Sequence, residues 1–497
     1  MRPVTPFPEH PKAGRSLLAF ERDLPPWGPS LILLLCAVTN ALGASSPLEV
    51  TLSLDAGLRA HLHWEPLPHP ALYTVESTDS LDQVWKSVPP AGQWPIEGTE
   101  FVDPRASFLP AHRFYRVVAE TIPEPTRAAL ISFRQEDSLS PDQVLDWAER
   151  IGITGIAGEV GVTLYSVLYE TIDAQGRQTV ASGGVVIPSE TDAPLPLFSF
   201  QHDTVLDREN VPSRFRFDSL ESLMPIFAAS QGFVAAAPDY LGLGDSPGFH
   251  PYLIANAAAN AVVDLLPIAA EIANAEGFET LGEVYLMGYG EGGFATMAAH
   301  RELESDPDSS LEVIASVPMA GPYDLSDLFL SSMLDENLDH PNPFIFPYWV
   351  RAYDDVYDLY DDPLEVFTRS VTTRALPRMN GRTDGEAMNQ LLPSSHPRSL
   401  LQDRFVLSLS AESEHPFQIA LQRNNVYDWK PRAPIRMYHC DADLTFTKSH
   451  SEKALDAFFA NGSNAGELID PIPSLNHAEC DGVSFTSAMI WINRQRN

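Results

Sequence analysis

The stretch EVYLMGYGEGGFATMAAH, residues 283–300, joins an apolar segment typical of a strand to a segment typical of a helix through a glycine-rich turn. A strand, a sharp turn and a helix in this order form the nucleophile elbow G-x-S-x-G, in which a serine stands at the head of the helix. The outer glycines are needed because the turn is tight, and the central residue takes a strained backbone with positive φ. Here the frame is complete, but Gly290 holds the central position.

The chemistry of such an elbow needs a hydroxyl at position 290. In acyl transfer the serine oxygen attacks a carbonyl, a histidine takes its proton and an acid fixes the tautomer of the histidine. Gly290 has no side chain, so no acyl-enzyme can form. Loss of one member of a catalytic triad leaves oxyanion-hole and binding effects of ~10³ over water. We therefore expect little or no catalysis of the serine type.

Around the elbow, apolar strands alternate with helices, which predicts an α/β domain with a mostly parallel central sheet over residues 161–497. The domain opens with a hairpin, Val162–Thr171 and Thr179–Ile187, bridged by a polar turn. The remaining expected strands are Leu195–Phe200, Gly232–Pro238, Glu283–Met287, Leu311–Val317 and Ile435–His439, and the expected helices are Tyr252–Asn274, Gly293–Glu304 and Ser449–Phe459.

Residues of about 325–408 interrupt this alternation with aromatic side chains interleaved with aspartates. An insertion at this point would lie over the carboxyl edge of the sheet as a helical cap, where apolar substrates are usually bound. A solvated helical insert with a buried aromatic face accounts for the same pattern equally well.

Residues 45–120 show short alternating segments separated by turns that carry proline and glycine, which predicts a small all-β sandwich. YTVESTDSLDQVW (73–85) and RFYRVV (113–118) resemble a fibronectin type III-like module; the alternative is a β extension packed on the larger domain. Residues 121–160 are interpreted as a linker, marked by two prolines, and an N-terminal helix. The expected core of the sandwich consists of Trp64, Tyr73, Trp85, Phe101, Phe114 and Tyr115.

Residues 1–44 are predicted to be a signal peptide with a long leader. An apolar stretch begins at Leu31–Leu35 and runs to Ala44, shorter than the ~20 residues that a membrane-spanning helix needs. Small residues at its end fit a signal-peptidase site. We expect a secreted or periplasmic protein without a stable membrane span.

The chain carries 67 Asp and Glu against 32 Lys and Arg, for a formal net charge of −35. Such a surface repels phosphate backbones and anionic lipid headgroups, so we expect neither a nucleic acid nor a membrane surface as partner. The simplest interpretation of the acidity is solubility.

Two cysteines, Cys440 and Cys480, would remain after removal of the signal peptide. An even number in an exported protein suggests a disulfide, and two buried free thiols are the alternative. Closure of a loop of this size would stabilise the fold by ~4 kcal/mol.

The elbow, PDYLGLGDSPGFHPY (238–252) and FSFQHDT (198–204) resemble bacterial secreted lipase/esterase-like α/β-hydrolases over roughly residues 161–494. The resemblance implies an α/β-hydrolase fold with an acid after the penultimate strand and a histidine after the last strand. Asp443 in YHCDADLTF matches the acid, with Asp441 as the alternative, and His477 in SLNHAEC matches the histidine. The order nucleophile, acid, histidine is the one that this fold uses. A Cys440–Cys480 bridge would tie the acid loop to the histidine loop.

The same resemblance locates the oxyanion hole. Its loop is His202-Asp203-Thr204 here, where the family usually has His-Gly-Thr. The loop at Asp203 and Thr204 is expected to donate one backbone N–H, and the N–H of Glu291 the other. An ionised Asp203 would oppose negative charge on a substrate. Two departures at one site therefore indicate a real loss of the chemistry.

These observations favour an α/β-hydrolase of the carboxylic-ester hydrolase or lipase type that is a pseudoenzyme, impaired or non-catalytic, and keeps Asp443, His477 and a ligand pocket. One alternative is an active hydrolase in which His477 activates a water molecule or Asp203 serves as the base. Another is a non-catalytic adhesion or binding protein. We expect no cofactor and no metal. The expected partners are a small-molecule ester or lipid-like ligand and, through the β module, a protein or polysaccharide.

Overall fold

The computed structural model describes residues 31–34, 50–55, 59–65, 71–78, 86–87, 99–103, 112–121 and 127–496, the last range without 151–159, 192, 217–218, 307–308 and 412–414. The chain divides into two compact units, Met1–Glu124 and Pro125–Asn497.

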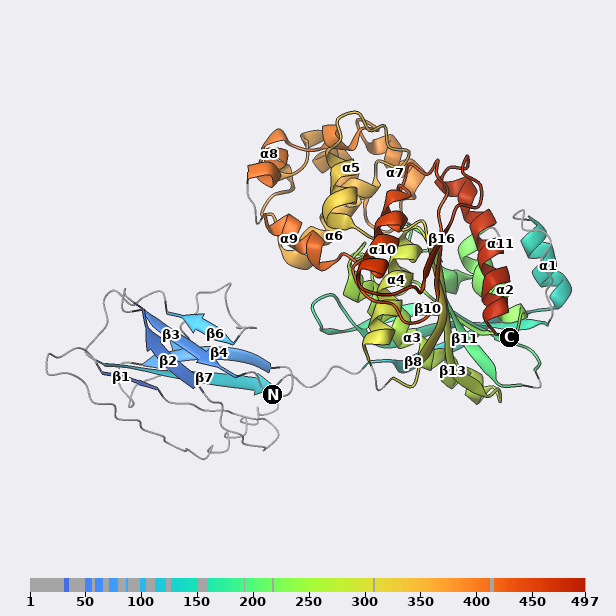
Figure 1. The fold of residues 1–497 in the computed structure, drawn as a ribbon, viewed down its shortest axis with the longest axis horizontal. Coiled ribbons are helices and arrows are strands. Elements are labelled where there is room, and N and C mark those ends of the chain that lie inside the picture. Colours follow the sequence, from blue (N-terminus) through green and yellow to red (C-terminus); the bar gives the residue numbers. More distant parts are fainter. Residues whose placement is uncertain are drawn as a thin grey trace, which may run out of the picture. The chain divides into compact units, whose positions relative to one another are not determined.

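The first unit contains short strands in two small sheets, with the orders β1-β7-β4-β5 and β2-β3-β6 (Figure 1). The short alternating segments predicted over residues 45–120 correspond to strands here, and β1 is additional. The strands are β1 (Leu31–Leu34), β2 (Val50–Leu54), β3 (Ala60–Trp64), β4 (Ala71–Thr78), β5 (Lys86–Ser87), β6 (Glu100–Val102) and β7 (His112–Thr121).

Alternating side chains of these strands form the core of the first unit. The rings of Trp64 and Tyr73 pack with their centroids 5.3 Å apart, and the buried hydroxyl of Tyr115 donates to Asp103 at 2.8 Å. Of the six aromatic residues expected in this core, four are buried, Phe114 is half-buried and Trp85 lies outside the described residues.

Most of the predicted signal peptide, residues 1–44, lies outside the described residues. Leu31–Leu34, at the start of its apolar stretch, is strand β1 and runs parallel to β7. A short apolar run satisfies the pattern of a strand and that of a signal segment equally. Export therefore stays a prediction.

A nine-stranded sheet with the order β16-β15-β14-β13-β11-β12-β10-β9-β8 forms the centre of the second unit. Neighbouring strands are parallel from β16 to β12, whereas β10 is antiparallel to β12 and the strands β8, β9 and β10 alternate in direction. The strands are β8 (Ala129–Leu139), β9 (Val162–Ile172), β10 (Gln178–Pro188), β11 (Leu195–Gln201), β12 (Val234–Pro238), β13 (Thr280–Tyr289), β14 (Glu312–Met319), β15 (Ile435–Tyr438) and β16 (Gly466–Ile469).

Helices cover both faces of this sheet. One face carries α3 (Ala255–Ala275), α4 (Glu291–Ser305) and α10 (Ser449–Ala460), and the other carries α1 (Pro141–Arg150), α2 (Leu220–Ser230) and α11 (His477–Gln495) (Figure 1). Every residue of the central strands β11 and β12 is buried, as a sheet covered on both faces requires. The predicted α/β sheet is confirmed.

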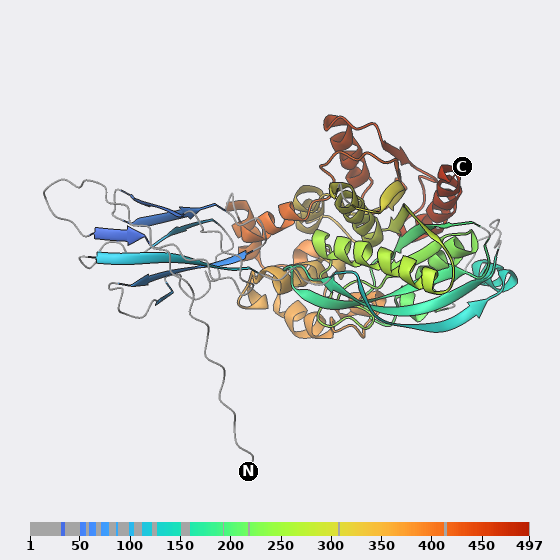
Figure 2. The same ribbon diagram turned by 90° about the horizontal axis from the view of Figure 1, so that it is seen from below.

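Helix α3 runs beside the sheet (bright green in Figure 2). Among the helices of the described residues, it alone is long and apolar enough to cross a membrane, and 67% of that apolar window is buried inside the unit.

Strand β8 departs from the predicted organisation. The sequence predicts a linker and a helix over residues 121–160; the helix is α1, but β8 precedes it and pairs with β9 at the edge of the sheet. Nearly all of β8 is exposed or half-buried, so the apolar alternation that identifies a half-buried strand is missing. The second unit therefore includes residues that the sequence assigns to a linker.

A helical insertion lies between β14 and β15 (yellow to orange in Figure 1). It is present where the sequence predicts it, at about residues 325–408, and continues through α9. Its α-helices are α5 (Leu330–Leu334), α6 (Ile345–Tyr357), α7 (Gly385–Leu391), α8 (Asp403–Ala411) and α9 (Pro416–Arg423). The aromatic residues Phe346, Tyr348, Trp349 and Tyr353 of α6 are buried, which explains the aromatic spacing.

Candidate active site

The turn around Gly290 has the geometry of a nucleophile elbow. Strand β13 ends at Tyr289 and helix α4 begins at Glu291; Gly290 between them has φ 56° and ψ −118°. The positive φ is the one predicted for the central residue, and glycine adopts it without steric cost. A Cβ atom on Gly292 would overlap the carbonyl oxygen of Gln201, so the close approach of neighbouring backbone requires an outer glycine.

The predicted acid and histidine meet. Asp443 lies on the loop after β15, and His477 is the first residue of α11, where Asn476 caps the helix. Nδ1 of His477 lies 2.6 Å from Oδ2 of Asp443. Oδ1 of Asp443 accepts backbone N–H groups from Thr445 at 2.8 Å and Phe446 at 3.1 Å. The acid is therefore buried, held by its own loop and aimed at the histidine.

Asp441, the alternative acid, does not take this position. Its side chain is 71% exposed and lies 3.7 Å from the ammonium group of Lys448. A carboxylate in solvent cannot orient a buried imidazole, so Asp443 is the partner of His477.

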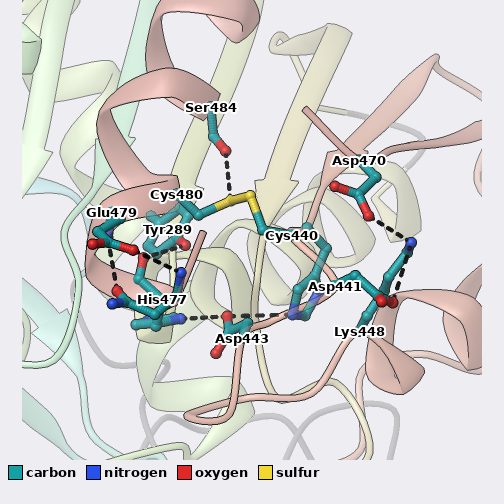
Figure 3. The surroundings of a disulfide bond; sticks show 12 residues. Tyr289, Cys440, Asp441, Asp443, Lys448, Asp470, His477, Glu479, Cys480 and Ser484 are labelled. Atoms are coloured by element: carbon teal, nitrogen blue, oxygen red, sulfur yellow. Dashed lines mark hydrogen bonds and ion pairs between the residues drawn. A yellow bond between two sulfur atoms is a disulfide. The ribbon is translucent and has the colours of Figure 1, made fainter. Parts of the chain in front are cut away.

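Cys440 and Cys480 form a disulfide, as predicted. Figure 3 shows the bridge beside His477 and Asp443. The bond joins the end of β15 to the first turn of α11, and its two residues are 40 apart in the sequence. It thus fixes the two segments that carry the acid and the histidine.

The carboxylate of Asp203 fills the space beside Gly290. A Cβ atom on Gly290 would overlap Oδ1 of Asp203 and would lie 3.0 Å from its Oδ2. Oδ2 is 3.4 Å from Nε2 of His477. The carboxylate therefore stands where a serine side chain would stand, facing the histidine.

The same carboxylate occupies the two backbone donors that the sequence predicts for an oxyanion hole. Oδ1 of Asp203 accepts the backbone N–H of Thr204 at 2.7 Å and that of Glu291 at 3.0 Å. These distances are the ones at which an oxyanion hole holds a developing charge. The predicted donors Thr204 and Glu291 do converge. Asp203 lies in the same loop as predicted, and its carboxylate is the acceptor of both N–H groups.

Charge at the site follows from this arrangement. Burial would lower the pKa of His477, but the carboxylates of Asp203 and Asp443 outweigh burial and raise that pKa to about 10. Burial opposes ionisation of both carboxylates, yet the pKa of Asp443 falls through His439 and His477, and the pKa of Asp203 falls through His477 and two backbone N–H groups. At neutral pH the site is an imidazolium between two carboxylates.

Two buried histidines support the site and escaped the sequence analysis. Nε2 of His250 lies 2.6 Å from the carboxylate of Glu291, which follows the elbow, and Nε2 of His439 lies 3.4 Å from Oδ2 of Asp443. Both occur inside quoted motifs, GFHPY and YHCDADLTF. A motif does not show which carboxylate a histidine meets in space.

A cavity of about 450 Å³ adjoins Asp203 and His477. The insertion supplies seven of its lining residues, so the insertion is a cap over the site. Within the described ranges, no group of three or more His, Cys, Asp and Glu side chains is arranged to hold a metal ion. The cap contributes Pro341, Asn342, Phe344, Ile345, Gly385, Glu386 and Asn389, and the loops that carry the predicted site residues contribute Asp203, Thr204, Thr445, Phe446 and His477.

Solved structures share this architecture. The rice cell wall degrading esterase LipA from Xanthomonas oryzae is 27% identical with a TM-score of 0.64, over 74% of this chain and 95% of LipA. A putative hydrolase from Legionella pneumophila is 25% identical with a TM-score of 0.68, over 74% of this chain and 98% of the hydrolase. The fold is that of the α/β-hydrolases.

A more distant structure agrees. Candida antarctica lipase A in its closed state is 17% identical with a TM-score of 0.54, over 74% of this chain and 82% of the lipase. No family model matches the sequence, and a search of curated proteins finds no match. The solved structures support an α/β-hydrolase of the esterase and lipase type.

Proposed function

We propose that this protein is an esterase-type α/β-hydrolase that has lost ester hydrolysis through serine and keeps its pocket as a ligand-binding site. The observation that carries the proposal is the position of Asp203, whose carboxylate takes both the nucleophile's space and the oxyanion hole.

Three elements of acyl transfer are disabled together. Gly290 offers no nucleophile, and the N–H groups of Thr204 and Glu291 are already bonded to Asp203. His477, whose pKa is raised to about 10 by the flanking carboxylates, has no lone pair on Nε2 at neutral pH to accept a proton. An ester carbonyl would meet neither a serine hydroxyl nor free oxyanion donors.

The same charge counts against His477 as the activator of a water molecule on an ester. A protonated imidazole cannot act as a base, and the tetrahedral intermediate of the attacked ester would have no oxyanion hole. A pure adhesion protein would have no need for an ordered acid–histidine pair beside a capped cavity. The retained pocket therefore favours ligand binding.

The ligand that we propose is an uncharged ester or lipid-like molecule. Phe344, Ile345 and Phe446 give the mostly polar cavity an apolar portion, and the acidic residues of the site and of the chain repel anions. We also propose export, which the disulfide supports because such bonds persist in oxidising compartments. A protein or polysaccharide partner for the first unit is a further proposal that rests on the sequence alone.

The test compares hydrolysis and binding in the full chain. We expect no turnover of p-nitrophenyl butyrate and no labelling by a fluorophosphonate, together with binding of the intact ester detected by saturation-transfer NMR. Ile345→Trp, which fills the cavity, should abolish that binding, whereas Leu407→Trp on the exposed side of α8 should not. Turnover that His477→Ala abolishes would contradict the proposal.

A further inference from the structure

The two oxygens of Asp203 have separate environments. Oδ1 is held by two backbone N–H groups, from Thr204 and Glu291. Oδ2 faces Nε2 of His477 at 3.4 Å, and this nitrogen is buried without a hydrogen-bond partner in the described part of the chain. The carboxylate lines the cavity, and its side chain is 28% exposed. One oxygen is fixed, and the other is available to a molecule in the cavity.

We infer that Asp203 is a relocated nucleophile, whose Oδ2 displaces a leaving group from a saturated carbon bound in the cavity. The substrate class is a neutral alkyl compound with a leaving group on carbon, either an alkyl halide or an epoxide. This inference goes beyond the loss of ester hydrolysis, because it assigns a different reaction to the same residues.

The occupied oxyanion hole explains why the attacked atom is a saturated carbon. Attack on a carbonyl develops negative charge on the carbonyl oxygen, and the donors that would stabilise this charge are taken by Oδ1. Displacement at a saturated carbon forms no such oxyanion. The Oδ2–carbon bond forms, the bond from carbon to the leaving group breaks, and the leaving group departs with the electron pair.

The oxyanion hole then serves the second step. After alkylation Asp203 is itself an ester, and Oδ1 is its carbonyl oxygen, already bonded to the N–H groups of Thr204 and Glu291. Water attacks Cγ, its proton passes to Nε2 of His477, and the negative charge develops on Oδ1. Cleavage of the Cγ–Oδ2 bond releases the alkoxide, which takes the proton from His477. Water is thus consumed, the carboxylate is restored and the alcohol carries the former Oδ2.

The charges support this order of steps. Two carboxylates keep His477 protonated in the resting protein. Alkylation neutralises Asp203 and removes one of these charges, so the pKa of His477 falls and its proton can leave with the halide or go to the opened epoxide oxygen. Nδ1 stays bonded to Asp443, which keeps the lone pair on Nε2 and directs it to the water. The histidine becomes a base only after Asp203 has reacted.

The lining of the cavity is mostly polar, and one apolar portion of it can contact a short uncharged alkyl group. Pro341, Phe344, Ile345 and Phe446 supply apolar surface around a volume of about 450 Å³. The amides of Asn342 and Asn389 also line it, and among the described residues their N–H groups make long contacts of 3.5 Å, to Thr445 and Pro341. Contacts of this length allow either amide to turn toward a departing halide or alkoxide.

The experiment uses the full chain and two probes, 1-bromohexane and 1,2-epoxyhexane. His477→Gln should stop the second step, so mass spectrometry should find a hexyl or hydroxyhexyl group on the peptide that contains Asp203. When it is added to His477→Gln, Asp203→Asn should prevent this adduct. As a single variant, Asp203→Asn should release product ~10³-fold or more slowly than the wild type. Asp207→Asn, nearby but outside this cavity, is the matched control. If only one of the two probes forms an adduct, that probe identifies the leaving group.

A second measurement needs no variant. In a single turnover of the wild type in heavy-oxygen water, the label should enter Asp203 and not the alcohol. Absence of product from both probes in the wild type, label in the alcohol after a single turnover, or an adduct that survives Asp203→Asn would overturn the inference. None of these outcomes affects the proposal that ester hydrolysis has been lost, because that proposal fails only if p-nitrophenyl butyrate is turned over.

Discussion

The side chain of Asp203 and the missing side chain of Gly290 share one volume. Any Cβ on residue 290 would overlap Oδ1 of Asp203, which the N–H groups of Thr204 and Glu291 hold in place. The glycine is therefore the residue that allows an acid to enter the elbow. The two departures from an esterase site are one structural unit.

Restoration of ester hydrolysis should therefore need two substitutions. Gly290→Ser alone should stay inactive, because its side chain meets the Asp203 carboxylate and the oxyanion hole stays filled. Asp203→Gly with Gly290→Ser should exceed the single variant by at least ~100-fold in kcat/KM for p-nitrophenyl butyrate, the order of effect of freeing an oxyanion donor. Asp441→Gly with Gly290→Ser, which alters an exposed acid, is the control and should remain inactive. Full activity of Gly290→Ser alone would contradict this prediction, because it would show that the Asp203 carboxylate moves out of the site readily.

The ion pair of His477 predicts a stability loss at alkaline pH. The pKa of His477 is about 10 in the fold, above the ~6.5 of an unfolded chain. Its contribution is complete below pH ~6.5 and disappears as pH rises through about 10. In Asp203→Asn this pKa should fall, and the alkaline loss should begin at lower pH. Urea unfolding across this range and NMR titration of the imidazole measure both effects. A neutral-range titration of His477 in the wild type would contradict the prediction.

Asp443 should matter for stability at the other end of the pH scale. Its carboxylate is buried and accepts two backbone N–H groups as well as the imidazole. Asp443→Asn should lower the free energy of unfolding by ~2–4 kcal/mol at neutral pH, because a buried charge network loses a partner. The pKa of Asp443 is lowered in the fold, so its contribution is present above pH ~3.9 and is lost as pH falls through the lowered value. The exposed Asp441→Asn should change little, and equal losses in both variants would count against this role.

Loss of the disulfide should destabilise the second unit. Cys440 and Cys480 close a loop of 40 residues, for which loop entropy predicts ~3–4 kcal/mol. Both sulfurs are buried, so substitution of both cysteines by alanine is a cleaner test than reduction. The urea midpoint of the double variant should fall well below that of Ser484→Ala, which changes only a hydroxyl beside the bridge. An unchanged midpoint would mean that the remaining fold already fixes the two loops.

Sequence patterns predict much of the second unit because apolar strands and helices repeat there with clear periods. The elbow, Asp443, His477 and the cysteine pair follow from short motifs with fixed positions in the fold. Strand β8 is missed because its side chains are mostly exposed and its pairing depends on backbone bonds to β9.

The placement of Asp203 is predicted only as a neighbour of the oxyanion hole. That its carboxylate turns inward depends on the volume that Gly290 leaves free, which no local pattern encodes. The His250–Glu291 contact is hidden for a similar reason, since its two residues are 41 positions apart in the sequence.

The shared volume of residues 203 and 290 also constrains the evolutionary route between this site and one with a serine. A chain that gained the aspartate while the serine remained would suffer a clash at the elbow, whereas a chain that first lost the serine would carry only an empty turn. The route through glycine at 290 first therefore avoids an overlap that the other order creates. Once both residues are in place, a serine at 290 also requires the carboxylate of Asp203 to move. The two positions are thus coupled, and a change at one alters the effect of a change at the other.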